Sequence, residues 1–125
     1  MTEMAAELTC ILVVEDEPLI RFAIVDYLQD LGFQVLEAAN ATDAITQLEL
    51  HSEIQAMFTD VDMPGGVTGL LLSKAVRDRW PPIHIIVTSG KSHFTADELP
   101  LRATFVSKPY DPAEIVAGFR QLVDA

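Results

Sequence analysis

The sequence predicts one α/β domain built on a doubly wound, parallel five-stranded sheet. Short apolar runs of strand length alternate along the chain with longer segments whose apolar residues recur at helical spacing. Such alternation is typical of a parallel sheet with helices on both faces. The chain has 125 residues, 50% of them hydrophobic, which suits a single hydrophobic core. We expect residues 10–124 to form this stand-alone domain and residues 1–9 to be a flexible N-terminal tail.

The first strand and the first helix are predicted near the N-terminus. Cys10–Val14 is a continuous apolar run, which is typical of a strand buried on both faces. Pro18 suits the first position of a helix, and Gly32 is a typical residue to end one. Between them, apolar residues at helical spacing predict the buried stripe of this helix, namely Ile20, Ile24, Tyr27, Leu28 and Leu31.

Two further strands are predicted in the middle of the chain. Gln34–Ala38 alternates weakly between apolar and polar residues, and Asn40 or Thr42 can cap the helix that follows it. The next apolar run ends at Asp60, and Pro64 prevents that strand from continuing. Asp60 is therefore predicted to lie at the carboxyl end of a strand.

The C-terminal half predicts two helices and two strands. A loop with three glycines, Gly65–Gly69, leads to a helix that ends at Trp80, just before two prolines. The fourth strand is predicted at Ile83–Val87 and the fifth at Ala103–Ser107. A last helix is predicted to begin at Asp111 and Pro112, because proline suits the first turn of a helix.

The charge distribution excludes one class of function. The formal net charge is -11, and residues 1–62 hold thirteen acids and a single base, Arg21. Such a surface repels phosphate backbones, so we expect no direct contact with nucleic acid. No apolar stretch approaches the length of a membrane span, and the lone Cys10 lies in an apolar run. We therefore expect a cytoplasmic protein without a membrane contact.

Polar side chains follow the predicted strands at their carboxyl ends. These residues are Glu15 and Asp16 after the first strand, Asp60 after the third, Thr88 and Ser89 after the fourth, and Lys108 after the fifth. Because the carboxyl ends of parallel strands share one edge, we expect all of them to line one crevice. Close carboxylates need a cation, and oxygen ligands select a hard ion such as Mg²⁺. The pattern predicts phosphoryl chemistry, with Asp60 as the nucleophile and Lys108 and Thr88 contacting the phosphoryl oxygens.

Four motifs in this order resemble those of receiver domains of two-component response regulators. They are Val-Val-Glu15-Asp16, Thr-Asp60-Val-Asp62-Met-Pro64, Val-Thr88-Ser89-Gly and Ser-Lys108-Pro109-Tyr110. The resemblance covers residues 10–123 and implies a flavodoxin-like fold with the strand order 2-1-3-4-5 and a cis peptide before Pro109. It implies phosphorelay signalling, in which a histidine kinase or histidine phosphotransfer protein phosphorylates Asp60 and contacts with a downstream protein target change. Such a domain phosphorylates and dephosphorylates itself without being a conventional enzyme.

The resemblance also implies a role for each residue of the site. Asp16 and Asp60 would ligate Mg²⁺ through their carboxylates, Asp62 through its backbone carbonyl, and Glu15 through a water molecule. Lys108 would hold the phosphoryl group.

A switch pair is implied as well, formed by Thr88, which moves towards the phosphoryl group, and Phe105, which turns inward behind it. Three features depart from the common pattern of these domains. The loop Gly65–Gly69 is one residue longer, the side chain of Asp62 adds a negative charge beside the phosphate, and Ser92–Arg102 is short and contains a proline. We therefore expect a shortened fourth helix.

A partner surface is predicted on the first helix. Leu19 and Phe22 lie off its predicted buried stripe, with Arg21 and Val25 beside them, and they follow directly after the acidic residues. A docking surface for the histidine-bearing helix of a kinase is one interpretation. Apolar side chains that are exposed without any partner are the other.

Two further functions stay open at this point. A small Mg²⁺-dependent phosphatase would use Asp60 as nucleophile and Asp62 as general acid, and a receiver-like binding module would not be phosphorylated at all. Thr88, Phe105 and Lys108 also have purely structural alternatives: a turn hydroxyl, a core aromatic and a solvated lysine, respectively.

Overall fold

The structure is a computed structural model that describes residues 8–63, 68–92 and 94–124. Five strands form one parallel sheet in the order β2-β1-β3-β4-β5, as predicted. The strands are β1 (Cys10–Val14), β2 (Gln34–Ala38), β3 (Ala56–Asp60), β4 (His84–Ser89) and β5 (Ala103–Ser107). The helices are α1 (Pro18–Asp30), α2 (Ala41–Leu50), α3 (Gly69–Arg79) and α4 (Pro112–Asp124), with a short 3₁₀ turn, η1 (Ala96–Glu98).

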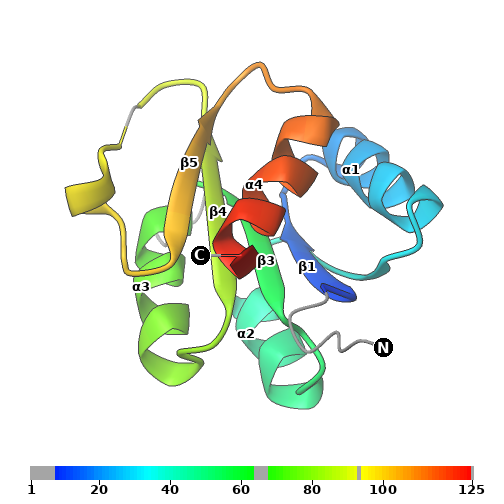
Figure 1. The fold of residues 1–125 in the computed structure, drawn as a ribbon, viewed down its shortest axis with the longest axis horizontal. Coiled ribbons are helices and arrows are strands. Elements are labelled where there is room, and N and C mark those ends of the chain that lie inside the picture. The colour runs from blue at the N-terminus through cyan, green and yellow to red at the C-terminus, as the bar shows by residue number, and fades with distance from the viewer. Residues whose placement is uncertain (1–7, 64–67, 93, 125) are drawn as a thin grey trace.

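The sheet carries two helices on each face. Helices α1 and α4 cover one face, and α2 and α3 cover the other (Figure 1). Each face has its own cluster of buried side chains, because successive residues of a strand point to opposite sides. β1 and β3 are buried along their whole length, which explains the continuous apolar sequence of β1 and the apolar start of β3.

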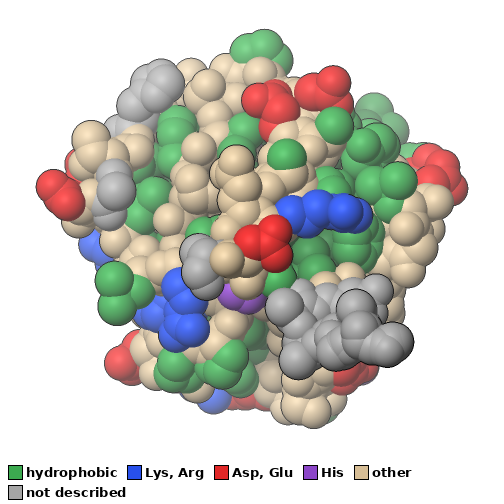
Figure 2. Space-filling view, viewed as in Figure 1, with side chains coloured by type: hydrophobic (Ala, Val, Ile, Leu, Met, Phe, Trp, Pro, Cys, Tyr) green, Lys and Arg blue, Asp and Glu red, His purple; other side chains and the backbone are tan. Residues whose placement is uncertain are grey.

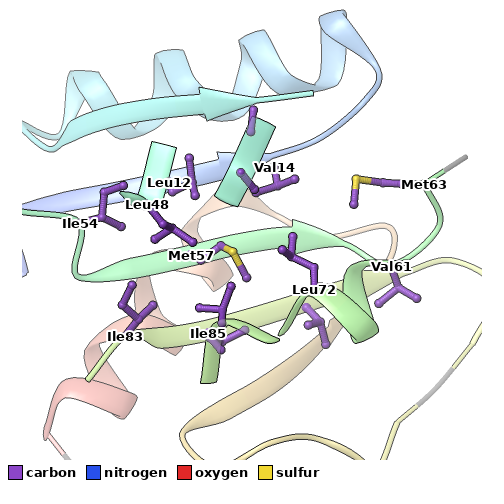
Figure 3. Close-up of a cluster of buried hydrophobic side chains, with 14 of the residues drawn as sticks. Leu12, Val14, Leu48, Ile54, Met57, Val61, Met63, Leu72, Ile83 and Ile85 are labelled. Atoms are coloured by element: carbon purple, nitrogen blue, oxygen red, sulfur yellow. The ribbon is translucent and has the colours of Figure 1, made fainter. Parts of the chain in front are cut away.

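The cluster between the sheet and helices α2 and α3 also anchors the loop that follows β3. Leu12, Met57 and Ile85 form its centre (Figure 3). Val61 and Met63, the residues on either side of Asp62, are buried in the same cluster. The backbone directly after Asp60 is therefore fixed by hydrophobic packing.

The predicted buried stripe of α1 is partly wrong. Ile24 and Leu28 are buried as predicted, but Val25, which was placed beside the stripe, is buried as well. Ile20 is 41% exposed and Leu31 51% exposed. Both lie at the ends of the helix, Ile20 in its first turn and Leu31 at its C-cap, and the buried residues lie between them.

The predicted C-terminal end of α1 and the predicted N-terminal end of α2 are confirmed. Gly32 follows α1 with φ of 97°, a left-handed conformation that glycine adopts without strain. The side chain of Asn40 accepts a hydrogen bond from the Asp43 amide at 2.8 Å, so Asn40 rather than Thr42 caps α2.

The predicted shortening of the helix between β4 and β5 is confirmed: among the residues described there, the 3₁₀ turn η1 is the only helical element. Phe94 and Leu99, on either side of this turn, pack against the cluster on the α2 and α3 face. The predicted tail falls mostly on residues 1–7 and the predicted lengthening of the loop after β3 mostly on residues 64–67, all outside the described residues. None of the helices described has the length and apolar character needed to cross a membrane.

Candidate functional site

Three acidic side chains meet at the carboxyl edge of the sheet. Glu15, Asp16 and Asp60 each offer one carboxylate oxygen, and these atoms lie within 4.8 Å of one another. Their convergence follows from the pairing of β1 with β3, which places Val14 opposite Thr59 and so brings the ends of the two strands together. An all-oxygen, anionic donor set of this kind fits a hard divalent cation such as Mg²⁺.

The Asp60 carboxylate is buried and held from two sides. Asp60 is 3% exposed. Its Oδ1 accepts a hydrogen bond from the Asp62 amide at 2.8 Å, and its Oδ2 accepts one from Lys108 Nζ at 2.5 Å. Lys108 is thus engaged in the site and is not a solvated lysine. The peptide between Lys108 and Pro109 is cis, as predicted.

The electrostatics of the site show a crowding of negative charge. Burial raises the pKa of Glu15 to about 7; the hydrogen bond from the Glu17 amide opposes this rise, and the charge of Asp60 adds to it. Partial burial alone would lower the pKa of Lys108, but its hydrogen bond to Asp60 and the surrounding carboxylates outweigh that effect and raise it. Lys108 therefore stays protonated and offsets part of the acid charge.

The side chain of Asp62 turns towards the segment after β4. Its Oδ2 accepts hydrogen bonds from Ser89 Oγ at 2.8 Å and from the Gly90 amide at 3.3 Å. The same Ser89 oxygen accepts hydrogen bonds from the amides of Lys91 and Ser92. Asp62 and Ser89 therefore tie the loop after β3 to the start of the segment that leads to η1.

Thr88 and Phe105, the predicted switch pair, contact residues other than Asp60 in this structure. Thr88 and Ser89 belong to β4, which extends two residues beyond its predicted end. The buried hydroxyl of Thr88 donates to the carbonyl of Val106 at 2.6 Å. Phe105 packs edge-on against Phe94, with ring centroids 5.7 Å apart. In this conformation Thr88 is a satisfied strand hydroxyl and Phe105 is a partly buried aromatic.

The three residues of the predicted partner surface differ in exposure. Leu19 is 82% exposed and Phe22 is 68% exposed. Figure 2 shows hydrophobic side chains gathered over α1. Arg21, however, is bound within the chain: Nη1 donates to the Glu15 carbonyl at 2.7 Å and Nε to Glu37 Oε1 at 3.1 Å. Sequence reasoning missed Glu37: the implied strand order places the end of β2 beside that of β1, but it does not show which side chains pair there.

Charged side chains elsewhere on the surface are mixed. On the face viewed in Figure 2, Lys and Arg side chains lie in small groups among acidic and apolar ones and form no continuous stripe.

The sequence matches a known family over most of its length. The model of the family described as "Response regulator receiver domain" matches residues 11–120. The chain is similar to the sensor kinase CckA of Brucella abortus, with 31% identity over 127 residues, and to the response regulator Rre1 of Synechocystis sp., with 33% identity over 125 residues. The matches cover 98% and 94% of this chain but only 13% and 53% of the two relatives.

A solved structure resembles the whole fold. The response regulator protein TrrA from Thermotoga maritima, solved in complex with Mg²⁺-BeF, has a TM-score of 0.78 and 26% sequence identity to this chain. The match covers 92% of this chain and 99% of TrrA as solved.

Proposed function

The chain belongs to the family of response regulator receiver domains of two-component systems, and on this premise we propose that it accepts one phosphoryl group on Asp60 in a Mg²⁺-dependent reaction. The observation that carries the proposal is the position of the Asp60 carboxylate, buried between the ammonium of Lys108 and two further acids. No other described group of three acids offers its oxygens so close together.

The transfer step follows from this arrangement. A carboxylate oxygen of Asp60 forms a bond to phosphorus while the bond between phosphorus and the donor's histidine nitrogen breaks. The nitrogen keeps the electron pair of that bond and takes up a proton, and Asp60 becomes an acyl phosphate. Lys108, now bound to Asp60 Oδ2, is close enough to stabilise negative charge on the transferred phosphoryl oxygens. Attack of water on phosphorus later releases phosphate and restores the carboxylate.

Receiver domains of this family bind Mg²⁺ at their acidic pocket, and the donor set described above fits that ion. We propose that the carboxylates of Asp16 and Asp60 and the backbone carbonyl of Asp62 hold it, with Glu15 acting through a water molecule. When bound, Mg²⁺ supplies positive charge for the phosphoryl oxygens.

Receiver domains interact with histidine kinases or phosphotransfer proteins, and we propose a donor of this kind here. The exposed side chains of Leu19 and Phe22 rise from the helix that begins beside the acidic cluster, which supports a docking role for this surface. A downstream protein target would respond to a switch in which Thr88 leaves the Val106 carbonyl for the phosphoryl group and Phe105 turns inward.

The contacts of Asp62 and Lys108 disfavour the two other functions, a phosphatase and an unphosphorylated binding module. A phosphatase with Asp62 as general acid needs that carboxylate free to protonate a leaving group, whereas it accepts hydrogen bonds from Ser89 and Gly90. A binding module without chemistry needs neither the Lys108 contact nor the acidic cluster.

The test compares phosphate transfer with turnover. The protein is incubated with Mg²⁺ and either a small acyl phosphate or a generic phosphomonoester, and bound and released phosphate are measured. A receiver takes up to one phosphoryl group per chain from the acyl phosphate and leaves the phosphomonoester intact. Continuous hydrolysis of the phosphomonoester would identify a phosphatase, and no uptake from either donor would identify a binding module.

A further inference from the structure

Arg21 ties together three elements at the edge of the acidic cluster. Its guanidinium extends from α1 to the Glu15 carbonyl, just beyond the end of β1, and to the carboxylate of Glu37 in β2. The side chain of Arg21 is only 21% exposed, in contrast to its apolar neighbours Leu19 and Phe22. Arg21 is therefore committed to contacts within the chain.

The contact with Glu15 falls on the short turn that carries two of the three acids. Between β1 and α1, residues 15–17 include both Glu15 and Asp16. The Glu15 amide donates to the Ala38 carbonyl at 3.0 Å, so β2 holds the preceding peptide, between Val14 and Glu15. Arg21 Nη1 holds the Glu15 carbonyl, which belongs to the peptide between Glu15 and Asp16. The guanidinium thus fixes the orientation of the backbone from which both carboxylates extend.

Arginine suits this position better than lysine. The two nitrogens that it uses, Nε and Nη1, belong to one planar group, so a single side chain can hold the Glu15 carbonyl and the Glu37 carboxylate in a fixed relation. A lysine ammonium lacks this planar geometry. Groups that orient metal ligands without touching the metal commonly change its affinity by about 10–100-fold when they are removed.

We propose that Arg21 is a positioning residue of the metal site, which holds the peptide between Glu15 and Asp16 so that both carboxylates face Asp60. This inference rests on the proposed function, because it assumes that the acidic cluster takes up Mg²⁺. It assigns Arg21 to the phosphorylation chemistry and leaves the docking surface to Leu19 and Phe22.

The experiment measures the Mg²⁺ dissociation constant of the full chain and of the variants Arg21→Gln and Arg21→Lys by titration calorimetry. Arg79→Gln is the matched control, since it removes a guanidinium that pairs with Glu49 at 2.8 Å at the far end of α3. We expect Mg²⁺ affinity to fall about tenfold or more in Arg21→Gln and by a smaller factor in Arg21→Lys. Arg79→Gln should keep the parent affinity, and melting curves show whether each variant is folded at the assay temperature.

A second readout separates positioning from docking. With a small acyl phosphate as donor, Arg21→Gln should need more Mg²⁺ for half-maximal phosphorylation but approach the parent rate at saturating Mg²⁺. An unchanged Mg²⁺ affinity, with slower transfer only from a protein donor, would overturn the proposal and make Arg21 a docking residue. If Arg21→Gln does not fold, Arg21→Lys decides, and parent affinity in that variant overturns the proposal.

Failure of the proposed function gives a different pattern. A chain that binds Mg²⁺ but takes up no phosphoryl group contradicts the function, while the comparison of Mg²⁺ affinities still tests Arg21. A parent chain that binds no Mg²⁺ overturns the role of Arg21.

Discussion

The ammonium of Lys108 donates a hydrogen bond to Asp60 Oδ2 at 2.5 Å, across 48 positions of the sequence. The two residues lie at the ends of β5 and β3, with β4 between them. Asp60 is almost fully buried, and the side chain of Lys108 is 27% exposed. This pair offsets part of the negative charge of the acidic cluster.

Replacement of Lys108 by alanine should therefore lower the free energy of unfolding mainly without Mg²⁺ and slow phosphorylation when Mg²⁺ is present. Without Mg²⁺, Lys108→Ala should be destabilised by roughly 1–3 kcal/mol, less than for a fully buried pair because Lys108 is partly solvated. With Mg²⁺ the loss should be smaller, since the ion then neutralises the acids, but phosphorylation by a small donor should slow at least about tenfold. Urea melts with and without Mg²⁺ measure the first effect. Lys91→Ala, at an exposed lysine, is the control, and equal behaviour of the two variants would contradict this role.

The raised pKa of Glu15 gives a prediction for pH. The folded chain keeps a proton on Glu15 up to about pH 7, whereas the unfolded chain loses it near its ordinary value of 4.5. Between these values the folded state binds more protons, so metal-free stability should fall as pH rises through this window, by about 2–3 kcal/mol in total. Mg²⁺ needs the ionised acids, so its affinity should increase over the same range. Glu15→Gln should lack this part of the pH dependence. Identical pH profiles for the parent and Glu15→Gln would contradict the prediction.

Substitution of Gly69 should disturb the site through the backbone. A Cβ at Gly69 would lie 2.2 Å from the Asp60 carbonyl oxygen and 2.9 Å from Val61 Cα, and neither backbone atom can move freely. Gly69→Ala should cost about 3 kcal/mol or more and slow phosphorylation by displacing Asp60. Gly118→Ala is the comparison, because the one close contact of its Cβ would be the flexible end of Ile86 at 2.9 Å. Equal melting temperatures of the two variants would contradict the claim that position 69 must be glycine because α3 packs closely against the Asp60 backbone.

Phosphorylation of Asp60 should change the conformation of the segment Gly90–Arg102. Where the structure describes this segment, its only regular element is one 3₁₀ turn, and its start is tied to the loop after Asp60 by the Asp62–Ser89 hydrogen bond. Charge added at Asp60 would repel Asp62 and weaken this tie, while the Phe94–Phe105 contact would transmit movement of Phe105. Hydrogen exchange with and without an acyl-phosphate mimic should change most within Gly90–Arg102. A segment already as protected as the central strands, and unresponsive to the mimic, would rule out a mobile switch.

The fold could be predicted from sequence because its periodic signals are strong. The buried strand β1 is a continuous apolar run and β3 begins with one. Pro18 and Gly32 mark helix ends through their backbone conformations, and Asn40 does so through its side-chain hydrogen bond. Periodicity did not fix which face of a short helix is covered. The predicted stripe of α1 therefore leaves out Val25, which is buried, and includes Ile20 and Leu31, which are exposed.

The convergence of the site could also be predicted, since it needs only the rule that parallel strands share a carboxyl edge. The individual contacts could not. The Asp62–Ser89 and Arg21–Glu37 hydrogen bonds depend on side-chain rotamers, which residue patterns do not encode. The hydrogen bond of Thr88 to Val106 likewise depends on the rotamer of one side chain.

The most direct test of Asp60 as phospho-acceptor is the intact mass of the protein after incubation with Mg²⁺ and a small acyl phosphate. The parent should gain one phosphoryl group only when Mg²⁺ is present. Asp60→Asn should gain none, because it lacks the nucleophile, and Asp16→Ala should lose most of the labelling, because it lacks a metal ligand. Asp60→Asn should also be at least as stable as the parent without metal, which shows that its loss of labelling is not unfolding. Labelling of Asp60→Asn to the level of the parent would contradict the assignment.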